Sequence, residues 1–292
     1  MDNPSPVGIT GGTGVYDIPE LEVLESIAVD TPFGEPSDEY IRGNLEGVEV
    51  IFLSRHGRGH IHAATGVNYR ANIYGFKKLG VDSLLSVSAV GSMKEEHHPT
   101  DIIIPDQFFD NTRRRANTFF TDSPAIHVDL ADPTCPVLRE ALYRSGRKSG
   151  ASIRHGGTYI CIDGPAFSTR AESKIYRSWG VDIIGMSGAT EAKLCREAEL
   201  CYASLAMVTD YDVWKEGAED VTVEVIVANL RKNAETSRAI LKEAIQGIPR
   251  DRGCSCRSAL DNAIVGDIST VSNDSLARLG VLLDRCLPPG GQ

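Results

Sequence analysis

The chain lacks long apolar runs and an excess of positive charge. None of its apolar stretches reaches the roughly 18 residues of a membrane span, and Met1–Pro6 has no basic region followed by an apolar segment. Thirty Lys and Arg stand against 40 Asp and Glu, so the net charge is −10. This balance argues against nucleic acid or an anionic membrane as partner. We expect a soluble, cytoplasmic protein that binds any anion at a local site.

The seven cysteines lack the even number and the spacing of a secreted disulfide framework. We expect most of them to be buried thiols. The exception is Cys254-Ser255-Cys256, a C-x-C pair without a second close pair to complete a zinc site. A disulfide between residues so close together would be strained, so structural or redox use of the pair is the minority interpretation.

Three catalytic signatures are also missing. Gly185-Met186-Ser187-Gly188 lacks the second glycine of a nucleophile elbow at the required spacing. Gly12-Thr13-Gly14 fails as a dinucleotide fingerprint because Asp17 stands where the last glycine is needed. His56 and His60 have the spacing of helical metal ligands, but glycines separate them and no glutamate follows the first histidine. We therefore predict neither a dinucleotide cofactor at Gly12-Thr13-Gly14, nor a zinc site at His56 and His60, nor covalent serine catalysis.

Short β-rich apolar runs alternate with helical patterns, which indicates an α/β fold with a largely parallel sheet. The expected strands are Val7–Thr10, Val48–Ser54, Val81–Ala89, Val181–Met186 and Cys201–Val208, and the expected helices are Asn68–Leu79, Thr169–Trp179, Gly188–Leu200, Val223–Ile245 and Ser275–Leu287. We predict one domain in which helices flank a mixed, largely parallel sheet (α/β/α). Residues 1–6 form a flexible N-terminus, 7–248 the main domain, and 249–292 an extension with the C-x-C and a short helix, packed on that domain.

Polar and small residues follow the ends of the expected strands, where ligands of open α/β sheets bind. The residues at these ends are Thr13, Arg55, His56, Ser88, Ala89, Ser187 and Asp210. Gly11-Gly12-Thr13-Gly14 can cradle a phosphate by its backbone amides or form an ordinary tight turn. Arg55 and His56 directly follow a strand, and a guanidinium is a forked donor that suits an oxyanion.

Two carboxylates end the apolar run Cys201–Val208, in Thr209-Asp210-Tyr211-Asp212. Side chains two apart in a strand share a face, so we expect Asp210 and Asp212 to project together. Such a pair can read a base, donate a proton or hold a cation, and the alternative is a solvated turn that ends the strand.

The combined motifs resemble the trimeric purine nucleoside phosphorylase family, and in particular its members that act on 5'-methylthioadenosine. The resemblance is carried by Gly11-Gly12-Thr13-Gly14, Thr31-Pro32-Phe33-Gly34-Glu35-Pro36-Ser37, Arg55-His56-Gly57, Asn68-Tyr69-Arg70-Ala71-Asn72, Gly164-Pro165 with Phe167, and Thr209-Asp210-Tyr211-Asp212. It runs in order from about Val7 to Val227. It implies the single-domain phosphorylase fold and a homo-oligomer, either a trimer or a dimer of trimers.

The activity that the resemblance implies is phosphorolysis of 5'-methylthioadenosine to adenine and 5-methylthioribose 1-phosphate, a step of methionine and purine salvage. Inorganic phosphate is the co-substrate, and neither a cofactor nor a metal is needed. The implied phosphate ligands are Thr13, Arg55, His56, Ser88, the Ala89 backbone and Ser187. The implied catalytic residues are Asp210, which would contact N7 and the 6-amino group and act as general acid, and Asp212, which would support it.

The remaining implied substrate contacts surround the purine, the ribose and the methylthio group. Phe167 would border the purine and Met186 the ribose. Val223, Ile226 and Val227 match residues that contact the methylthio group, although their i, i+3, i+4 spacing equally suits the core face of a helix. His127 resembles a residue that reaches the site from a neighbouring subunit, and by itself it would be an ordinary loop histidine.

Some residues depart from the family pattern and leave alternatives open. Ala166 stands where an arginine commonly follows Gly-Pro, and Thr190 replaces a proline before Glu191. Members that prefer 6-oxopurines carry asparagine where Asp210 stands, so we expect adenine as the base. The alternatives are a phosphorylase for other purine nucleosides or methylthioinosine, a hydrolytic nucleosidase, and a nucleoside-binding module without turnover. The C-x-C resembles a feature of hexameric, heat-stable members, in which such cysteines can be disulfide-bonded.

Overall fold

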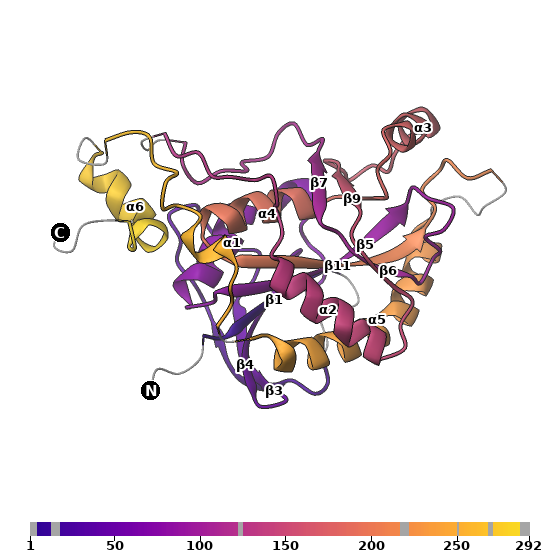
Figure 1. The fold of residues 1–292 in the computed structure, drawn as a ribbon, viewed down its shortest axis with the longest axis horizontal. Helices are drawn as coiled ribbons and strands as arrows, with labels where there is room; N and C mark the ends of the chain where they lie inside the picture. The colour runs from indigo at the N-terminus through magenta and orange to yellow at the C-terminus, as the bar shows by residue number, and fades with distance from the viewer. Residues whose placement is uncertain are drawn as a thin grey trace.

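A single mixed sheet runs through the molecule (Figure 1). The computed structural model describes residues 5–12, 18–121, 125–216, 222–249, 251–267 and 271–286. The strands of the sheet are β1 (Val7–Gly11), β2 (Glu22–Ile27), β3 (Tyr40–Leu45), β4 (Val48–Ser54), β5 (Ser83–Ser92), β6 (Ile102–Ile104), β7 (Gln107–Asp110), β8 (Ile153–His155), β9 (Thr158–Cys161), β10 (Ile183–Gly185) and β11 (Cys201–Asp210).

The sheet divides at β5, which pairs with three other strands. One path has the order β2-β3-β4-β1-β5-β10-β9-β7, and β11 leaves it by pairing with β5 and then with β6, which continues to β8. The central pairs β1 with β4, β1 with β5 and β5 with β11 are parallel, whereas β10 meets the end of β5 in antiparallel fashion. The prediction of a mixed, largely parallel sheet is confirmed.

Helices cover both faces of this sheet. They are α1 (Tyr69–Lys78), α2 (Pro136–Lys148), α3 (Arg170–Ser178), α4 (Gly188–Glu197), α5 (Val223–Gly247) and α6 (Asn273–Leu283), with the short 3₁₀ helices η1 (Ala64–Gly66) and η2 (Ser255–Ser258). Figure 1 shows α2 and α5 below β11, and α1 and α4 above it. The α/β/α arrangement is therefore confirmed.

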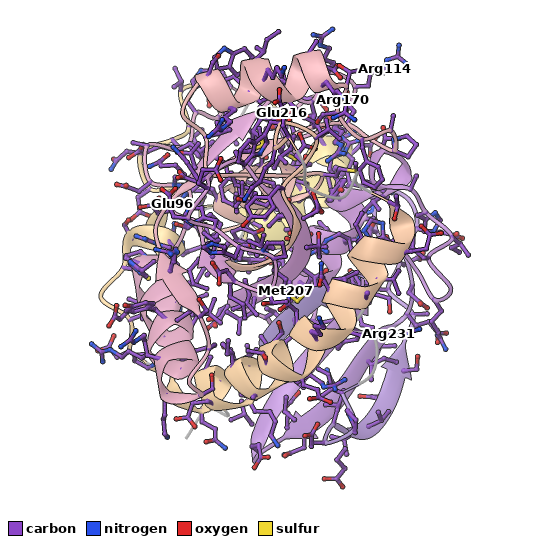
Figure 2. The ribbon with its side chains drawn as sticks, turned by 90° about the vertical axis from the view of Figure 1, so that its right-hand side faces the viewer. Glu96, Arg114, Arg170, Met207, Glu216 and Arg231 are labelled. Carbon is purple, nitrogen blue, oxygen red and sulfur yellow. The ribbon has the colours of Figure 1, made fainter. Side chains whose placement is uncertain are left out.

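Side chains of β11 alternate between the two faces, as strand geometry requires. Ala203, Leu205 and Met207 pack with apolar residues of α2 and α5, whereas Tyr202 packs with those of α1 and α4. Figure 2 shows Met207 in the interior beside α5, while Arg231 on that helix points outward. All ten residues of β11 are buried, so this strand is an interior support for whatever its ends carry.

Helix boundaries follow local capping chemistry. The Asn68 side chain accepts a hydrogen bond from the backbone N–H of Ala71 and starts α1, and Thr169 starts α3 in a capping box with Glu172. Gly80 follows α1 with φ of +79°, a conformation in which glycine carries no steric cost. The strand expected over Val181–Met186 is shorter, because only Ile183–Gly185 pairs with β5 and β9.

The C-terminal residues pack against both faces. Cys256 joins the apolar cluster of α2 and α5, whereas Leu260, Leu279 and Leu283 join the cluster of α1 and α4. Among the described helices, none combines the length and the apolar character needed to traverse a bilayer. The division into residues 1–6, 7–248 and 249–292 stays a prediction, and residues 1–4 lie outside the described part of the chain.

Candidate active site

A cavity of about 460 Å³ opens where β1, β4, β5, β10 and β11 reach their carboxyl ends. Its size is that of pockets that enclose a small organic ligand. The expected site residues that line it are Arg55, His56, Ser88, Ala89, Phe167, Met186, Ser187, Asp210, Asp212 and Ile226. Strand ends therefore bring together residues that lie more than 150 positions apart in the chain.

Four expected site residues are not placed in this cavity. Val227 is half-buried on α5 but does not line the cavity. His127 is exposed elsewhere, and its backbone N–H donates to the Ala263 carbonyl at 2.8 Å. Thr13 lies outside the described residues, and so does the side chain of Val223.

Asp210 and Asp212 both reach the cavity, but not through strand periodicity. A β-bulge between Val208 and Asp210 shifts the register of β11 on β5, so that Asp210 pairs with Gly91, and Asp212 lies beyond the strand with φ of +52°. The Asp212 backbone N–H donates to Asp210 Oδ1 at 2.8 Å, and the Thr209 hydroxyl donates to Oδ2 at 2.7 Å. The turn, rather than a common strand face, holds the two carboxylates together.

Both carboxyl groups are buried, and burial raises the pKa of each. Asp210 is 8 % and Asp212 6 % exposed. The hydrogen bonds from Thr209 and the Asp212 N–H partly offset the rise in the pKa of Asp210. Asp212 Oδ2 is buried and has no hydrogen-bond partner among the described residues. The cavity thus holds a carboxyl group suited to donate a proton and an oxygen free to accept a ligand N–H.

Arg55 directly follows β4 and is almost completely buried. Its Nε donates to Glu191 Oε1 at 2.5 Å, Nη1 donates to the Val87 carbonyl at 2.9 Å, and Nη2 bonds Ser86 Oγ at 2.7 Å and Glu191 Oε2 at 3.4 Å. The adjacent Glu191 carboxylate raises the pKa of Arg55, against the effect of burial. These bonds occupy four of five N–H groups, which leaves one Nη1 hydrogen for a ligand.

Gly12 lies next to Arg55 Nη1 and the His56 ring. A Cβ atom at Gly12 would lie 3.5 Å from Arg55 Nη1 and 3.7 Å from His56 Nε2, in van der Waals contact with both, so glycine leaves this space to a ligand. Ser88 adds a buried hydroxyl that has no partner among the described residues. A buried hydroxyl without a partner carries a free-energy cost that a bound anion would remove.

His56 is held as a neutral imidazole. Its Nδ1 lies 2.9 Å from the His62 carbonyl, which can only accept, so the proton is on Nδ1 and Nε2 carries a lone pair. Burial and the Arg55 charge lower the pKa of His56 to about 3. The ring stacks on His60 with centroids 4.2 Å apart. His56 Nε2 can therefore accept a hydrogen bond from the P–OH group of a hydrogen phosphate.

Comparison with known proteins places this geometry in a family. The family model described as "Phosphorylase superfamily" matches residues 6–246. The chain belongs to the phosphorylase superfamily. It is 51 % identical over 278 residues to the S-methyl-5'-thioadenosine phosphorylase of Geobacter sulfurreducens, covering 95 % of this chain and 97 % of that one. It is 49 % identical to the protein of the same name from Koribacter versatilis, with 96 % of both chains covered.

Solved structures of phosphorylases share the fold over nearly the whole chain. A methylthioadenosine phosphorylase from an Antarctic soil metagenomic library has a TM-score of 0.89 at 42 % identity and covers 98 % of this chain and 100 % of its own. The methylthioadenosine phosphorylase of Schistosoma mansoni, in complex with adenine, has a TM-score of 0.84 at 34 % identity. That comparison covers 92 % of this chain and 99 % of the other.

Two residues that hold this phosphorylase site together escaped the sequence analysis. Glu191 fixes Arg55, and Arg115 donates to the carbonyl groups of Met186 and, at 2.8 Å, Asp163. The Arg115 guanidinium is buried and lies over the Tyr69 ring at 5.1 Å. Neither residue sits at a strand end, so position along the chain gave no signal for it. Their role depends on partners that only the fold brings near.

Proposed function

We propose that this phosphorylase cleaves 5'-methylthioadenosine with inorganic phosphate, yielding adenine and 5-methylthioribose 1-phosphate. The observation that carries the proposal is the pairing, in one cavity, of an anion-binding corner with a buried carboxyl group of raised pKa. The anion-binding corner would hold the attacking phosphate, and the carboxyl group would protonate the departing base. Relatives named S-methyl-5'-thioadenosine phosphorylase, at 51 % and 49 % identity, support this substrate.

Phosphate would occupy the corner between Arg55, His56 and Ser88. The remaining Nη1 hydrogen and the Ser88 hydroxyl would donate to phosphate oxygens, and His56 Nε2 would accept from a P–OH group. The Ala89 backbone, Ser187 and Thr13 complete the proposed set. Because Glu191 neutralises Arg55, the corner binds an anion mainly through directed hydrogen bonds rather than through net positive charge.

In the reaction, a phosphate oxygen forms a bond to the anomeric carbon as the bond from that carbon to N9 breaks. The bonding electron pair moves into the purine, and Asp210 transfers its proton to N7 to neutralise the departing base. In the transition state the sugar is positive, so the phosphate anion beneath it also stabilises the charge. Holding both groups in place converts a bimolecular encounter into a step within one complex.

The other proposed contacts set substrate choice. Asp212 Oδ2 would accept from the 6-amino group of adenine, with Phe167 beside the purine and Met186 beside the ribose. Ile226, together with Val223, would face the methylthio group. His127 of a neighbouring subunit would complete the site in a homotrimer or a dimer of trimers. We propose that the enzyme works in the cytoplasm and that its reaction needs no cofactor and no catalytic metal.

The test is base release from 5'-methylthioadenosine, adenosine and methylthioinosine, each with and without phosphate. We expect adenine from methylthioadenosine only when phosphate is present, and a slower reaction of methylthioinosine. Release in phosphate-free buffer would indicate a hydrolase instead. Preference for methylthioinosine would overturn the assignment of the base, and no release from any of the three would overturn the enzymatic function.

A further inference from the structure

Four cysteines converge at the end of the molecule opposite the candidate active site. Cys135 precedes α2, Cys201 begins β11, and Cys254 and Cys256 flank the start of η2. Their sulfur atoms all lie within 4.8 Å of one another. In Figure 1, α2 begins beside the start of β11, and the Cys135 backbone N–H donates to the Tyr202 carbonyl at 2.7 Å. The C-x-C pair thus meets, in the fold, the second pair of thiols that it lacks in the sequence.

The spacing of the sulfurs suits a tetrahedral metal ion. With zinc–sulfur bonds of about 2.3 Å, the sulfurs of a tetrathiolate site stand about 3.8 Å apart. The Cys201 and Cys254 sulfurs are 3.5 Å apart and no two sulfurs are more than 4.8 Å apart, so shifts of about 1 Å or less would bring all four to that geometry. All four thiols are free in this structure. Among the residues that the structure describes, no other group of His, Cys, Asp or Glu side chains is dense enough for a metal.

The position of Cys135 favours a thiolate ligand. Cys135 is the N-cap residue of α2, where the helix dipole stabilises a negative charge. A metal binds thiolates rather than thiols, so the cysteines would lose their protons to solvent as the ion enters.

The surroundings of the cluster are dry. Cys135, Cys201 and Cys256 are at most 4 % exposed. The buried side chain of Arg252, two residues before Cys254, pairs with Asp82 at 2.7 Å and bonds Ser83, the partner of Cys201 in the β5–β11 ladder. These contacts hold the segment before Cys254 against the starts of β5 and β11.

We propose that Cys135, Cys201, Cys254 and Cys256 bind one Zn²⁺ in a structural tetrathiolate site. The ion enters as Zn²⁺, four Zn–S bonds form, and the protons of the thiols leave to solvent, so no oxidant or reductant takes part. All four positions are taken by protein, which makes the site closed and non-catalytic. The ion fastens the segment that contains η2 to the starts of α2 and β11.

The first test is the metal content of the full chain, produced with added zinc and purified under reducing, anaerobic conditions without chelator. We expect about one zinc per chain, and less than about 0.1 in Cys254→Ser and Cys256→Ser variants, since a four-ligand site tolerates few losses. Cys195→Ser is the matched control, because Cys195 is equally buried but outside the cluster, and it should keep the zinc.

A second measurement does not depend on the variants folding. Wild-type chain loaded with Co²⁺ should show thiolate-to-cobalt charge-transfer and tetrahedral d–d absorption, and Zn²⁺ should abolish both. Withdrawing zinc with a strong chelator should lower the Tm of the wild-type chain, and added Zn²⁺ should restore it. Phosphorolysis at 25 °C should stay unchanged in the Cys256→Ser variant, because the cluster and the cavity lie at opposite ends of β11.

Three results would overturn the proposal. The first is anaerobic wild-type chain with less than about 0.1 zinc and no cobalt spectrum. The second is a loss of about 2 Da for each cysteine pair in the masses of the peptides that contain the four cysteines, measured on reduced, anaerobic protein. This loss would mean disulfides in place of a metal. The third is iron as the bound metal, which would contradict the assignment of zinc.

Discussion

Arg55 is a cation whose charge the protein itself balances. Its place after a buried strand was predictable from the sequence, and so was its part in an anion site. Its partner Glu191 was not, since the two residues are 136 positions apart and only the packing of α4 against β5 brings them together. The same holds for Arg115, whose bonds to backbone carbonyls have no counterpart in any local pattern.

Removing the acidic partner of Arg55 should destabilise the protein strongly. Glu191→Gln leaves a buried guanidinium without its counter-charge, and we expect a loss of about 3–5 kcal/mol in the free energy of unfolding. Urea denaturation measures this loss. Glu140→Gln is the matched control, because Glu140 pairs with Arg144 on the exposed face of α2 and should contribute less than about 0.5 kcal/mol. Equal losses in both variants would contradict the structural role of Glu191.

Asp210 should affect turnover far more than phosphate binding. In Asp210→Asn the side chain keeps its size and can still accept from the Asp212 N–H, but it has no acidic proton for N7. We expect kcat to fall by about 10²–10⁴ and the Kd of phosphate to change by less than about threefold. Steady-state kinetics and phosphate titration separate the two effects.

The control for the kinetics is Asp274→Asn, an exposed change on α6, which should leave kcat and the Kd of phosphate unaltered. A parallel loss of kcat and phosphate affinity in Asp210→Asn would contradict the assigned role.

The raised pKa of Asp210 also predicts how stability depends on pH. Because burial raises this pKa, the folded state binds the proton more tightly than the unfolded state. The free energy of unfolding of the wild type therefore falls as pH rises from the ordinary Asp pKa through the raised one, and the Asp210→Asn variant should lose that component.

At the level of elements, the sequence predicted the helices and strands that are marked by local patterns such as caps and apolar runs. α1 and α3 have side-chain caps and a terminal glycine, and β4 and β11 are long apolar runs. The sequence did not predict the three-residue strands β6 and β8, and it predicted too long a strand for β10. Such short strands form only through pairing with distant partners. The bulge that aims Asp210 into the cavity is likewise a product of pairing with β5, invisible to a period-two pattern.

The end of β5 should not tolerate a side chain. A Cβ atom at Gly91 would lie 2.9 Å from Asp210 Oδ1 and 3.0 Å from Ile184 Cγ2, so Gly91→Ala should displace the carboxyl group. We expect kcat to fall by at least about tenfold, with an unfolding free energy lower by about 1–3 kcal/mol. Gly247→Ala, with nothing within 4 Å of the added carbon, is the control for the substitution itself. Full activity of Gly91→Ala would show that Asp210 can move without consequence.

At the level of the whole molecule, the sequence predicted the fold class, and ten of the fourteen residues expected at the site line the cavity. Its location at strand ends followed from the hydrophobic runs, whereas Phe167, Met186 and Ile226 were implied by the family resemblance. The sequence did not predict the sulfur cluster. Cys135 and Cys201 are solitary cysteines in the sequence, so the C-x-C pair alone gave no reason to expect a metal site. Only the path of the chain, which returns to the start of β11 after α5, places the four thiols side by side.

Oligomeric assembly can be tested by mixing subunits. If His127 serves the site of a neighbouring subunit, the His127→Ala and Asp210→Asn variants are each impaired on their own. A mixed oligomer regains a site wherever the His127→Ala chain supplies Asp210 and its neighbour, the Asp210→Asn chain, supplies His127. Co-expression in equal amounts should restore about a quarter of the wild-type sites in a cyclic trimer. The control is a mixture of the two variants purified separately and combined without unfolding, and this mixture should gain no activity. No recovery, or a fully active His127→Ala chain, would contradict the neighbouring-subunit role.

The division of the sheet at β5 has a consequence for exchange of backbone amide hydrogens with deuterium. Hydrogen bonds to β1 and β10 along one edge and to β11 along the other leave this strand no free side. Its amides should therefore exchange only when the whole domain opens, whereas those of the loop around Phe167 should exchange through local fluctuations. Ser88 and Ala89 thus belong to the slowest-exchanging part of the protein, and the purine side of the cavity belongs to a faster one.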